Sequence, residues 1–335
     1  MRIWGTHALR ALNVPFQDAT IVASALVQTS LWGIDSHGIA RLPHYLTRLS
    51  NRTINASPTM RFRKTAAATG SLNGNHGLGI AVCHFGMEKA IQLAARAGIG
   101  IVGIYNSSHC GALGLYTRYA ASKGMIGIAF THTDSLLVTF GGTQPFFGTN
   151  PISIAVPYPR REPLCVDMAT SIVPWNKIQN ARKTGERVPV GWAVDSEGND
   201  CTDPEAAVAV NPIGAHKGYA LSFLIDMLCG PLNGMAFGGH ISSMYEDINE
   251  KRRLGSLVLA IDPRRFSGGK ILRAAVQRAI DEVGSQSARV RYPGQPEYIA
   301  QRERLKNGIP VNDPLQREIQ MWSERLHIAP PAYSS

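Results

Sequence analysis

Residues Ile99–Phe130 read IGIVGIYNSSHCGALGLYTRYAASKGMIGIAF, and this stretch decides the fold. The apolar runs Ile99–Tyr105 and Met125–Phe130 have strand length, and Ala112–Ser122 between them has the spacing of a helix. A third run of strand length, Ile152–Val156, follows. Strands that alternate with helices in this way predict an α/β layer.

Working outward, the same alternation continues on both sides of this stretch. We expect strands at Thr65–Leu72 and Ser256–Ile261, and helices at Ile80–Ala97, ended by Gly98, and at Pro174–Lys183. Gly218–Gly230 (GYALSFLIDMLCG) predicts a buried helix, because it contains Asp226 and is shorter than the roughly 20 apolar residues that a bilayer requires.

The two ends of the chain have helical patterns instead. Asp18 is a plausible cap for a helix that ends at Leu31, and a second helix follows from Pro43. We therefore predict that a helical segment at 1–64 packs with a second one at 270–330, and that 65–269 forms the α/β domain. The three helices expected in the second segment are Lys270–Val283, Glu297–Lys306 and Pro314–Leu326.

Composition narrows the class of protein. Of the 335 residues, 44% are hydrophobic and 17% charged, which argues against disorder. The net charge of +10 comes from Lys and Arg dispersed in small groups such as Lys251-Arg252-Arg253, without a nucleic-acid-binding motif, so we expect small anions rather than nucleic acid as partners. The five cysteines form no Cys-x-x-Cys pair, and the ten histidines have no metal-ligand spacing, so no metal is expected.

No secretory leader or membrane span is visible in the sequence, so a cytoplasmic address is expected, with no membrane partner. Dinucleotide-binding fingerprints are also missing, since no strand leads into Gly-x-Gly-x-x-Gly. The glycines in Asn73–Gly79 and in Gly141–Pro151 are explained by tight turns alone. Asp167–Ser171 and Lys217, which stands where a helix begins, suggest in combination a phosphate-bearing ligand.

Two histidines are candidates for proton transfer. Ser36-His37-Gly38 is followed by Arg41 and Tyr45, so a proton carrier stands near a guanidinium that can bind a carboxylate. The alternative is a surface histidine beside a helix-capping arginine. His109 follows the strand Ile99–Tyr105 and precedes a helix, where α/β proteins tend to bind ligands. Its neighbour Cys110 is interpreted as a packing residue.

Taken in order, these segments resemble the malate/L-lactate dehydrogenase family, whose members lack the Rossmann fold. The matching strings span about residues 34–297 and include SHGIARLPHYLTRL, NSSHCGALGLY, GGTQPFFGTNPISIAVP, DMATSIVPWNKI, AHKGYALSFLIDMLCGPLNG and YPGQPE. HCGAL, SSMYED and YPGQ are most similar to the ureidoglycolate dehydrogenase branch. The resemblance implies a mixed-sheet, non-Rossmann cofactor domain, a homodimer, and oxidoreduction of a small 2-hydroxy or 2-oxo acid with NAD or NADP.

By position, the resemblance also implies roles for single residues. His109 is the expected acid/base and His37 the alternative, with Ser36, Arg41 and Tyr45 on the substrate side. The residues implied to contact the cofactor are Thr133, Asp167, Met168, Ala169, Lys217, Gly294, Gln295 and Pro296. Thr133 stands where the ureidoglycolate branch has serine, and Asn176 stands where relatives usually have glycine.

The substrate is left open at this point. Ureidoglycolate is the first candidate, followed by malate or lactate. The alternatives are reduction of a cyclic imino acid or of a diketo sugar acid, and a binding protein that has kept the fold without turnover.

Overall fold

The computed structural model describes residues 1–158 and 162–333. Its centre is a seven-stranded sheet in the order β1-β2-β3-β12-β4-β7-β8. β2 and β3 are parallel and the other neighbours antiparallel, so the sheet is mixed, as predicted. The strands are β1 (Arg61–Lys64), β2 (Thr69–Asn73), β3 (Ile99–Ser107), β4 (Ile126–Thr131), β7 (Ile152–Val156), β8 (Leu164–Met168) and β12 (Leu254–Ile261).

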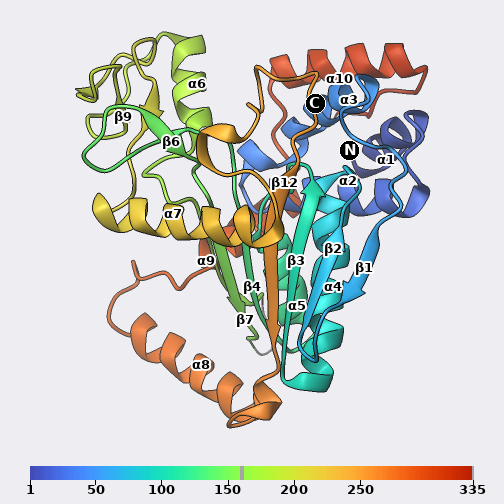
Figure 1. The fold of residues 1–335 in the computed structure, drawn as a ribbon, viewed down its shortest axis with the longest axis vertical. Coiled ribbons are helices and arrows are strands. Elements are labelled where there is room, and N and C mark those ends of the chain that lie inside the picture. Colours follow the sequence, from blue (N-terminus) through green and yellow to red (C-terminus); the bar gives the residue numbers. More distant parts are fainter. Residues whose placement is uncertain (159–161, 334–335) are drawn as a thin grey trace.

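Helices cover both faces of this sheet (Figure 1). α4 (Gly79–Ala97) and α5 (Gly114–Ser122) pack on one face, and α7 (His216–Cys229) crosses the other. Two glycines of β3 allow the chain on each face of the sheet to approach this strand closely. A Cβ at Gly100 would lie 2.0 Å from the Ala90 carbonyl oxygen of α4, and a Cβ at Gly103 would lie 2.0 Å from the Asn233 side chain just beyond α7.

A second, smaller sheet has the order β10-β9-β11-β5-β6. Its strands are β5 (Leu137–Val138), β6 (Pro145–Phe147), β9 (Ala193–Val194), β10 (Asp200–Cys201) and β11 (Ala209–Val210). α6 (Trp175–Thr184) packs against it through Ile178, which shares a core with Leu137 and Val210. The sequence analysis did not predict this sheet, because strands of two or three residues carry no readable alternation.

The first and last helices form a third layer. α1 (Arg2–Ala11), α2 (Phe16–Leu31), α3 (Leu42–Ser50) and α10 (Asp313–Leu326) share one apolar core, in which Leu26 and Leu46 lie with Trp322. The Trp4 indole donates a hydrogen bond of 2.8 Å to Ser323. α9 (Gln295–Asn307) contacts α2.

α8 (Gly269–Gly284) differs from the other helices of segment 270–330. Like α9 it has no buried residue, but it lies at the far end of the molecule from α1 and α10 (Figure 1). Within segment 270–330, α9 and α10 therefore lie against the N-terminal helices, and α8 does not. The domain limits at 64/65 and 269/270 stay a prediction.

Two local expectations were wrong. α2 begins at Phe16 after Pro15, and Asp18 lies in its first turn instead of capping it. There the carboxylate still interacts favourably with the helix dipole. α7 is not buried all round, since Leu224 is 61% exposed and Phe223 is 39% exposed. Its high apolar content indicated burial, but only the face with Ser222, Ile225 and Asp226 is covered.

Candidate active site

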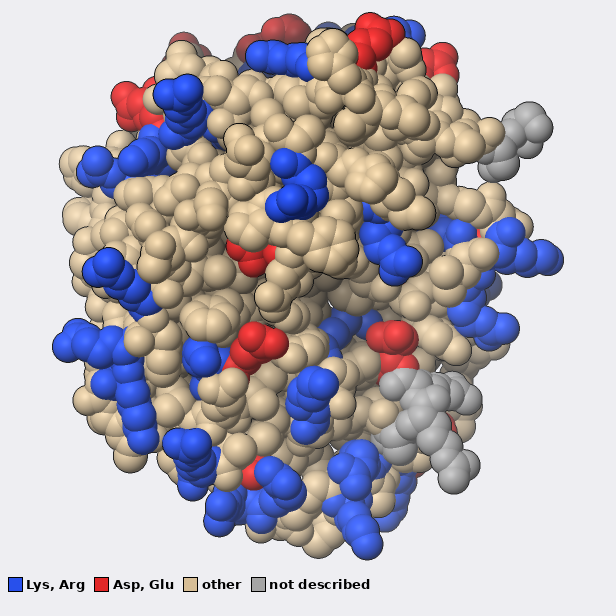
Figure 2. All heavy atoms as spheres, turned by 90° about the vertical axis from the view of Figure 1, so that its right-hand side faces the viewer, with Lys and Arg blue, Asp and Glu red and all other residues tan. Residues whose placement is uncertain are grey.

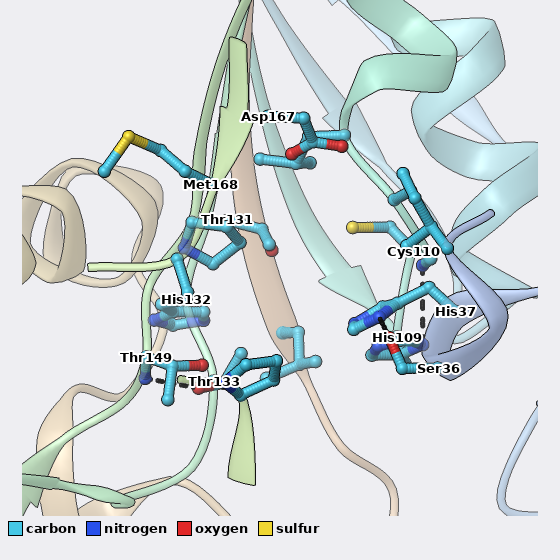
Figure 3. A pocket seen from close by; sticks show the side chains of 18 residues that line it. Ser36, His37, His109, Cys110, Thr131, His132, Thr133, Thr149, Asp167 and Met168 are labelled. Atoms are coloured by element: carbon cyan, nitrogen blue, oxygen red, sulfur yellow. Dashed lines mark hydrogen bonds between the residues drawn. The ribbon is translucent and has the colours of Figure 1, made fainter. Parts of the chain in front are cut away.

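One cavity lies where the carboxyl ends of β3, β4 and β8 approach the loop between α2 and α3. Its volume is about 180 Å³, below the 300–1,000 Å³ of ordinary drug-sized sites, so it suits a small acid better than a whole dinucleotide. Of the predicted site residues, the lining includes Ser36, His37, His109, Thr133, Asp167, Met168 and Ala169. Four separate stretches of chain therefore converge, as Figure 3 shows.

His37 and His109 form one wall of the cavity, with ring centroids 5.6 Å apart. The hydroxyl of Tyr45 lies 2.7 Å from His109 Nδ1, and that of Ser36 lies 2.9 Å from His37 Nδ1. Each imidazole is thus fixed through Nδ1, which leaves Nε2 as the atom that can exchange a proton with a ligand. Tyr45 is buried and stands behind His109, not on the cavity wall.

Arg41 also stands behind this wall. Its Nε donates to the Ser36 carbonyl oxygen over 2.6 Å, and its Nη1 donates to the Tyr245 hydroxyl over 2.9 Å. The Tyr245 hydroxyl in turn donates to Asn176 on α6 over 3.0 Å. Asn176, which stands where relatives usually have glycine, therefore connects Arg41 through Tyr245 to α6, the helix that packs against the smaller sheet.

The surroundings keep both histidines neutral. Burial lowers the pKa of His37 to about 4, and the nearby Arg41 charge lowers it further in the same direction. Burial also lowers the pKa of His109 well below its ordinary value, and the adjacent His37 ring and the Arg41 charge lower it further. A bound anion would reverse part of this depression, because it would offset the positive charges.

Polar side chains form the opposite wall, where His132, Thr133 and Thr149 face the two histidines (Figure 3). The Thr133 hydroxyl accepts a hydrogen bond of 3.1 Å from the Thr149 amide. Behind them, Asn150 accepts from the Thr133 amide and donates to the buried carboxylate of Asp226, at 2.9 Å and 3.0 Å. A network centred on the buried side chains of Asn150 and Asp226 therefore fixes this wall.

Asp167, Met168 and Ala169 line a third side, at the end of β8. The Gly114 amide at the start of α5 donates to Asp167 over 2.7 Å. Burial nevertheless dominates and raises the pKa of Asp167 to about 6, against the lowering effect of that amide and of Arg118. Near neutral pH this carboxyl can thus act as hydrogen-bond donor or acceptor.

The other predicted cofactor residues lie outside the cavity lining. Lys217 is exposed in the first turn of α7, and residues just before it bond to the chain after β8, as in the 2.9 Å bond from the Ile213 amide to Thr170. Gly294 precedes α9, and its neighbour Pro293 accepts from the Cys165 amide of β8 over 3.2 Å. All the predicted cofactor segments except Thr133 therefore border β8.

The sequence analysis missed several residues of this region. Thr149 lies in the glycine-rich run that tight turns seemed to explain, so the purely structural interpretation of that run was incomplete. His132 and Asp134 flank Thr133, and Arg252 contacts Asp134. Arg252 was missed because a Lys-Arg-Arg triplet is typical of solvated surface. Its position four residues ahead of the expected strand Ser256–Ile261 was the available signal.

The described surface carries dispersed positive charge, and the described residues form neither a metal-ligand cluster nor a membrane-spanning helix. On the face that Figure 2 shows, Lys and Arg are scattered among uncharged residues. Across residues 1–158 and 162–333, no three His, Cys, Asp or Glu side chains gather as metal ligands, and no helix combines the length and apolarity needed to cross a membrane.

Comparison with known proteins places the chain in a family. The malate/L-lactate dehydrogenase family model matches residues 1–320. The chain is 38% identical over 322 residues to L-sulfolactate dehydrogenase of Methanothermobacter thermautotrophicus, covering 96% of this chain and 94% of that one. It is 36% identical over 302 residues to ureidoglycolate dehydrogenase (NAD(+)) of Escherichia coli O157:H7, with 89% and 86% covered.

A solved structure agrees with these matches. Sulfolactate dehydrogenase from Methanocaldococcus jannaschii superposes with a TM-score of 0.91 at 32% identity, covering 98% of this chain and 96% of that one. The family model alone spans most of the chain, and the two alignments and the structural match extend over the same region. The chain therefore belongs to the malate/L-lactate dehydrogenase family and is a dehydrogenase.

Proposed function

We propose that this dehydrogenase transfers a hydride between NAD or NADP and a small 2-hydroxy acid or its 2-oxo form, with His109 as the proton carrier. The observation that supports this most strongly is the pair of imidazoles on the cavity wall, each with Nδ1 held by a hydroxyl. The relatives named for sulfolactate and ureidoglycolate support a 2-hydroxy acid as substrate.

The donor set opposite the histidines fits a nicotinamide. A carboxamide requires both donors and acceptors, and the hydroxyls of Thr133 and Thr149 offer both, as does Asp167 near its raised pKa. Apolar groups of Met168, Ala169 and Pro151 offer surfaces for the ring. When bound, the nicotinamide supplies or accepts the hydride. Lys217 and residues 294–296 are proposed to hold its more distant parts.

The chain's own residues account for substrate orientation and for the proton. His109 Nε2 takes the hydroxyl proton during oxidation and returns one to the oxo oxygen during reduction. Tyr45 keeps the ring aligned. Burial raises the pKa of Tyr45, so its hydroxyl stays protonated. Arg41, two of whose five N–H groups are engaged by Ser36 and Tyr245, attracts the carboxylate next to the reacting carbon.

The decisive experiment follows the absorbance of reduced nicotinamide with NAD and with NADP. The panel contains lactate, ureidoglycolate, malate, sulfolactate, their oxo forms, a cyclic imino acid and a diketo sugar acid. We expect turnover with at least one hydroxy-acid couple. Turnover confined to the imino or sugar acid would replace the substrate class, and inactivity with every compound would favour a binding protein.

A homodimer, which the family resemblance supports, and a cytoplasmic address belong to the same proposal. Light scattering on the purified chain tests the first, and a mass of one chain at assay concentration would contradict it. Cell fractionation of the producing organism tests the second.

A further inference from the structure

Three buried arginines gather beside the candidate active site. Arg41 is 9% exposed, Arg48 2% and Arg252 6%. The carboxylates near them are Asp134, which pairs with Arg252 at 2.7 Å, and Asp247, which adjoins Arg48. Three fixed positive charges therefore face two carboxylates, and this region carries an excess of positive charge that burial makes costly.

The donors of Arg48 are used by the protein itself. Its guanidinium donates to the carbonyl oxygens of Glu250 and Met244 and to the His44 ring, at 2.9, 2.8 and 3.1 Å. Arg48 thus fixes the chain around residues 243–250. Its charge remains, but its N–H groups serve the fold.

Arg252 is different. One nitrogen, Nη2, donates to Asp134, while Nε and Nη1 are buried and have no hydrogen-bond partner among the described residues. Buried N–H groups of a guanidinium are almost always paired, because leaving them unpaired forfeits their hydration without compensation. Two unpaired cationic nitrogens on a side chain that is nine-tenths buried are suited to binding an anion.

The register of the central sheet places Arg252 close to the active site, although its side chain lines a neighbouring cavity and not the one that His37 and His109 line. β12 begins two residues later, with Leu254 opposite Ser107 of β3 and Ser256 opposite Thr131 of β4. Arg252 therefore lies at the edge of the sheet from which β3 leads to His109 and β4 leads to Thr133. Leu254, His109 and Thr133 all line the cavity.

The electrostatics of the histidines agree with this placement. Burial lowers the pKa of His109 well below its ordinary value, and the charge of Arg252 is among those that lower it further. The same holds for His44, where burial is again the largest cause and Arg48 and Arg41 contribute with Arg252. Arg252 therefore acts electrostatically on the same pocket as Arg41.

We propose that Arg252 binds a second acidic group of the substrate, a carboxylate or a sulfonate, and so makes the enzyme selective for dianionic 2-hydroxy acids. The inference rests on the proposed function. Arg41 attracts the carboxylate next to the reacting carbon, and Arg252 pairs with the acidic group at the other end. A substrate without that group leaves the Arg252 donors unpaired, which penalises its binding.

The test compares acids that differ in the second acidic group alone. Lactate carries one carboxylate, and malate and 3-sulfolactate add a carboxylate or a sulfonate to its methyl carbon. We expect kcat/KM for one of the two diacids to exceed that for lactate by about 100-fold or more. Arg252→Gln should reduce the ratio of that kcat/KM to the kcat/KM for lactate by about 100-fold.

Two further variants complete the design. Arg253→Gln is the matched control, because it makes the same change at the adjacent, exposed arginine, and its acid selectivity should equal wild type. Arg252→Gln leaves the Asp134 carboxylate without its partner, so Arg252→Gln/Asp134→Asn removes the pair jointly and is used if the single variant does not fold. The double variant should show the same loss of selectivity.

Each remaining outcome contradicts the inference. Equal loss for lactate and the diacids would make Arg252 a structural residue. A higher KM for NAD or NADP with unchanged acid selectivity would assign its donors to a cofactor phosphate. Wild-type turnover of lactate or ureidoglycolate without preference for a diacid would refute the second anion site and leave the proposed function intact, whereas inactivity with all acids would refute both.

Discussion

At the scale of single residues, the His109 ring is the part of the site on which turnover depends most. The Tyr45 hydroxyl holds its Nδ1 at 2.7 Å, and the ring lines the cavity, so Nε2 is the nitrogen left for a ligand. We expect His109→Gln to lower kcat by about two to four orders of magnitude, with a cofactor dissociation constant near wild type. Stopped-flow kinetics and cofactor titration measure the two quantities.

His37→Gln is the matched control for that change, since its ring lies 5.6 Å from the first and is fixed in the same way. It should lose less activity than His109→Gln. Full activity in the His109 variant, together with an inactive His37 variant, would reverse the two roles.

The pKa of His37 predicts how stability depends on pH. The folded-state pKa of about 4 lies below the ordinary value of 6.5, mainly because of burial. Between these pH values the unfolded chain binds a proton at His37 that the folded chain excludes. The free energy of unfolding is therefore unaffected by the titration of His37 above pH 6.5 and decreases as the pH is lowered towards 4. Urea unfolding of wild type and His37→Gln, near neutral pH and near pH 4.5, measures the difference.

We expect the wild-type chain to lose more free energy of unfolding than His37→Gln over that pH interval. Parallel curves for the two proteins would mean that His37 titrates normally in the folded state.

At the scale of elements, the buried amide of Asn150 joins the loop before β7 to α7 and to the end of β4. It donates to Asp226 and to the Ser222 carbonyl oxygen and accepts from the Thr133 amide. Asn150→Ala would leave these buried groups unpaired, at about 1–3 kcal/mol each. We expect the free energy of unfolding to fall by about 3 kcal/mol or more in urea titrations.

Asn150→Asp separates packing from charge. It keeps the shape of the side chain but sets a second carboxylate against Asp226, so it should destabilise the protein at least as much as the alanine variant near neutral pH. A stable aspartate variant would contradict this role for the network.

The amino end of α7 carries the prediction for the cofactor. Lys217 is exposed in the first turn, next to the chain that follows β8. Lys217→Ala should weaken binding of NAD or NADP about three- to tenfold, as expected when an exposed cation near a phosphate is lost. Lys270→Ala on the remote α8 is the control, and fluorescence titration measures both. Equal dissociation constants in the two variants would reject the assignment.

The elements also show what the sequence could predict. Gly98 ends α4 in the left-handed region at φ 86°, as expected, and β7 has the predicted limits, because glycine and a clean apolar run are local signals. β1 (RFRK) was missed because three of its four residues are charged, although it pairs with β2 across only a short turn. Arg252 was missed because its charged neighbours are typical of solvated surface, whereas its burial depends on strands about 120 to 145 residues earlier.

For the molecule as a whole, the packing of the chain ends against each other matters most for stability. Trp322 of α10 is 2% exposed in the core that it shares with α1, α2 and α3. Trp322→Ala should reduce the free energy of unfolding by about 3–5 kcal/mol, the usual cost of removing a buried tryptophan. Met321→Ala, at a side chain that is 50% exposed, should change it by less than about 1 kcal/mol.

The stability of both variants is measured by denaturant unfolding, followed by tryptophan fluorescence and by far-ultraviolet circular dichroism. A loss of only about 1 kcal/mol at position 322 would mean that α10 is loosely attached to the N-terminal helices.

The shared core of α1, α2, α3 and α10 has a consequence for biosynthesis. A growing chain emerges from the ribosome amino end first. The apolar faces of α1, α2 and α3 around Trp4, Leu26 and Leu46 therefore remain uncovered until α10 has been translated, with its core residues Leu315, Ile319 and Trp322. Nascent chains halted before that point expose an apolar surface that chaperones bind. Chaperone occupancy should be lower on longer nascent chains whose α10 has left the exit tunnel.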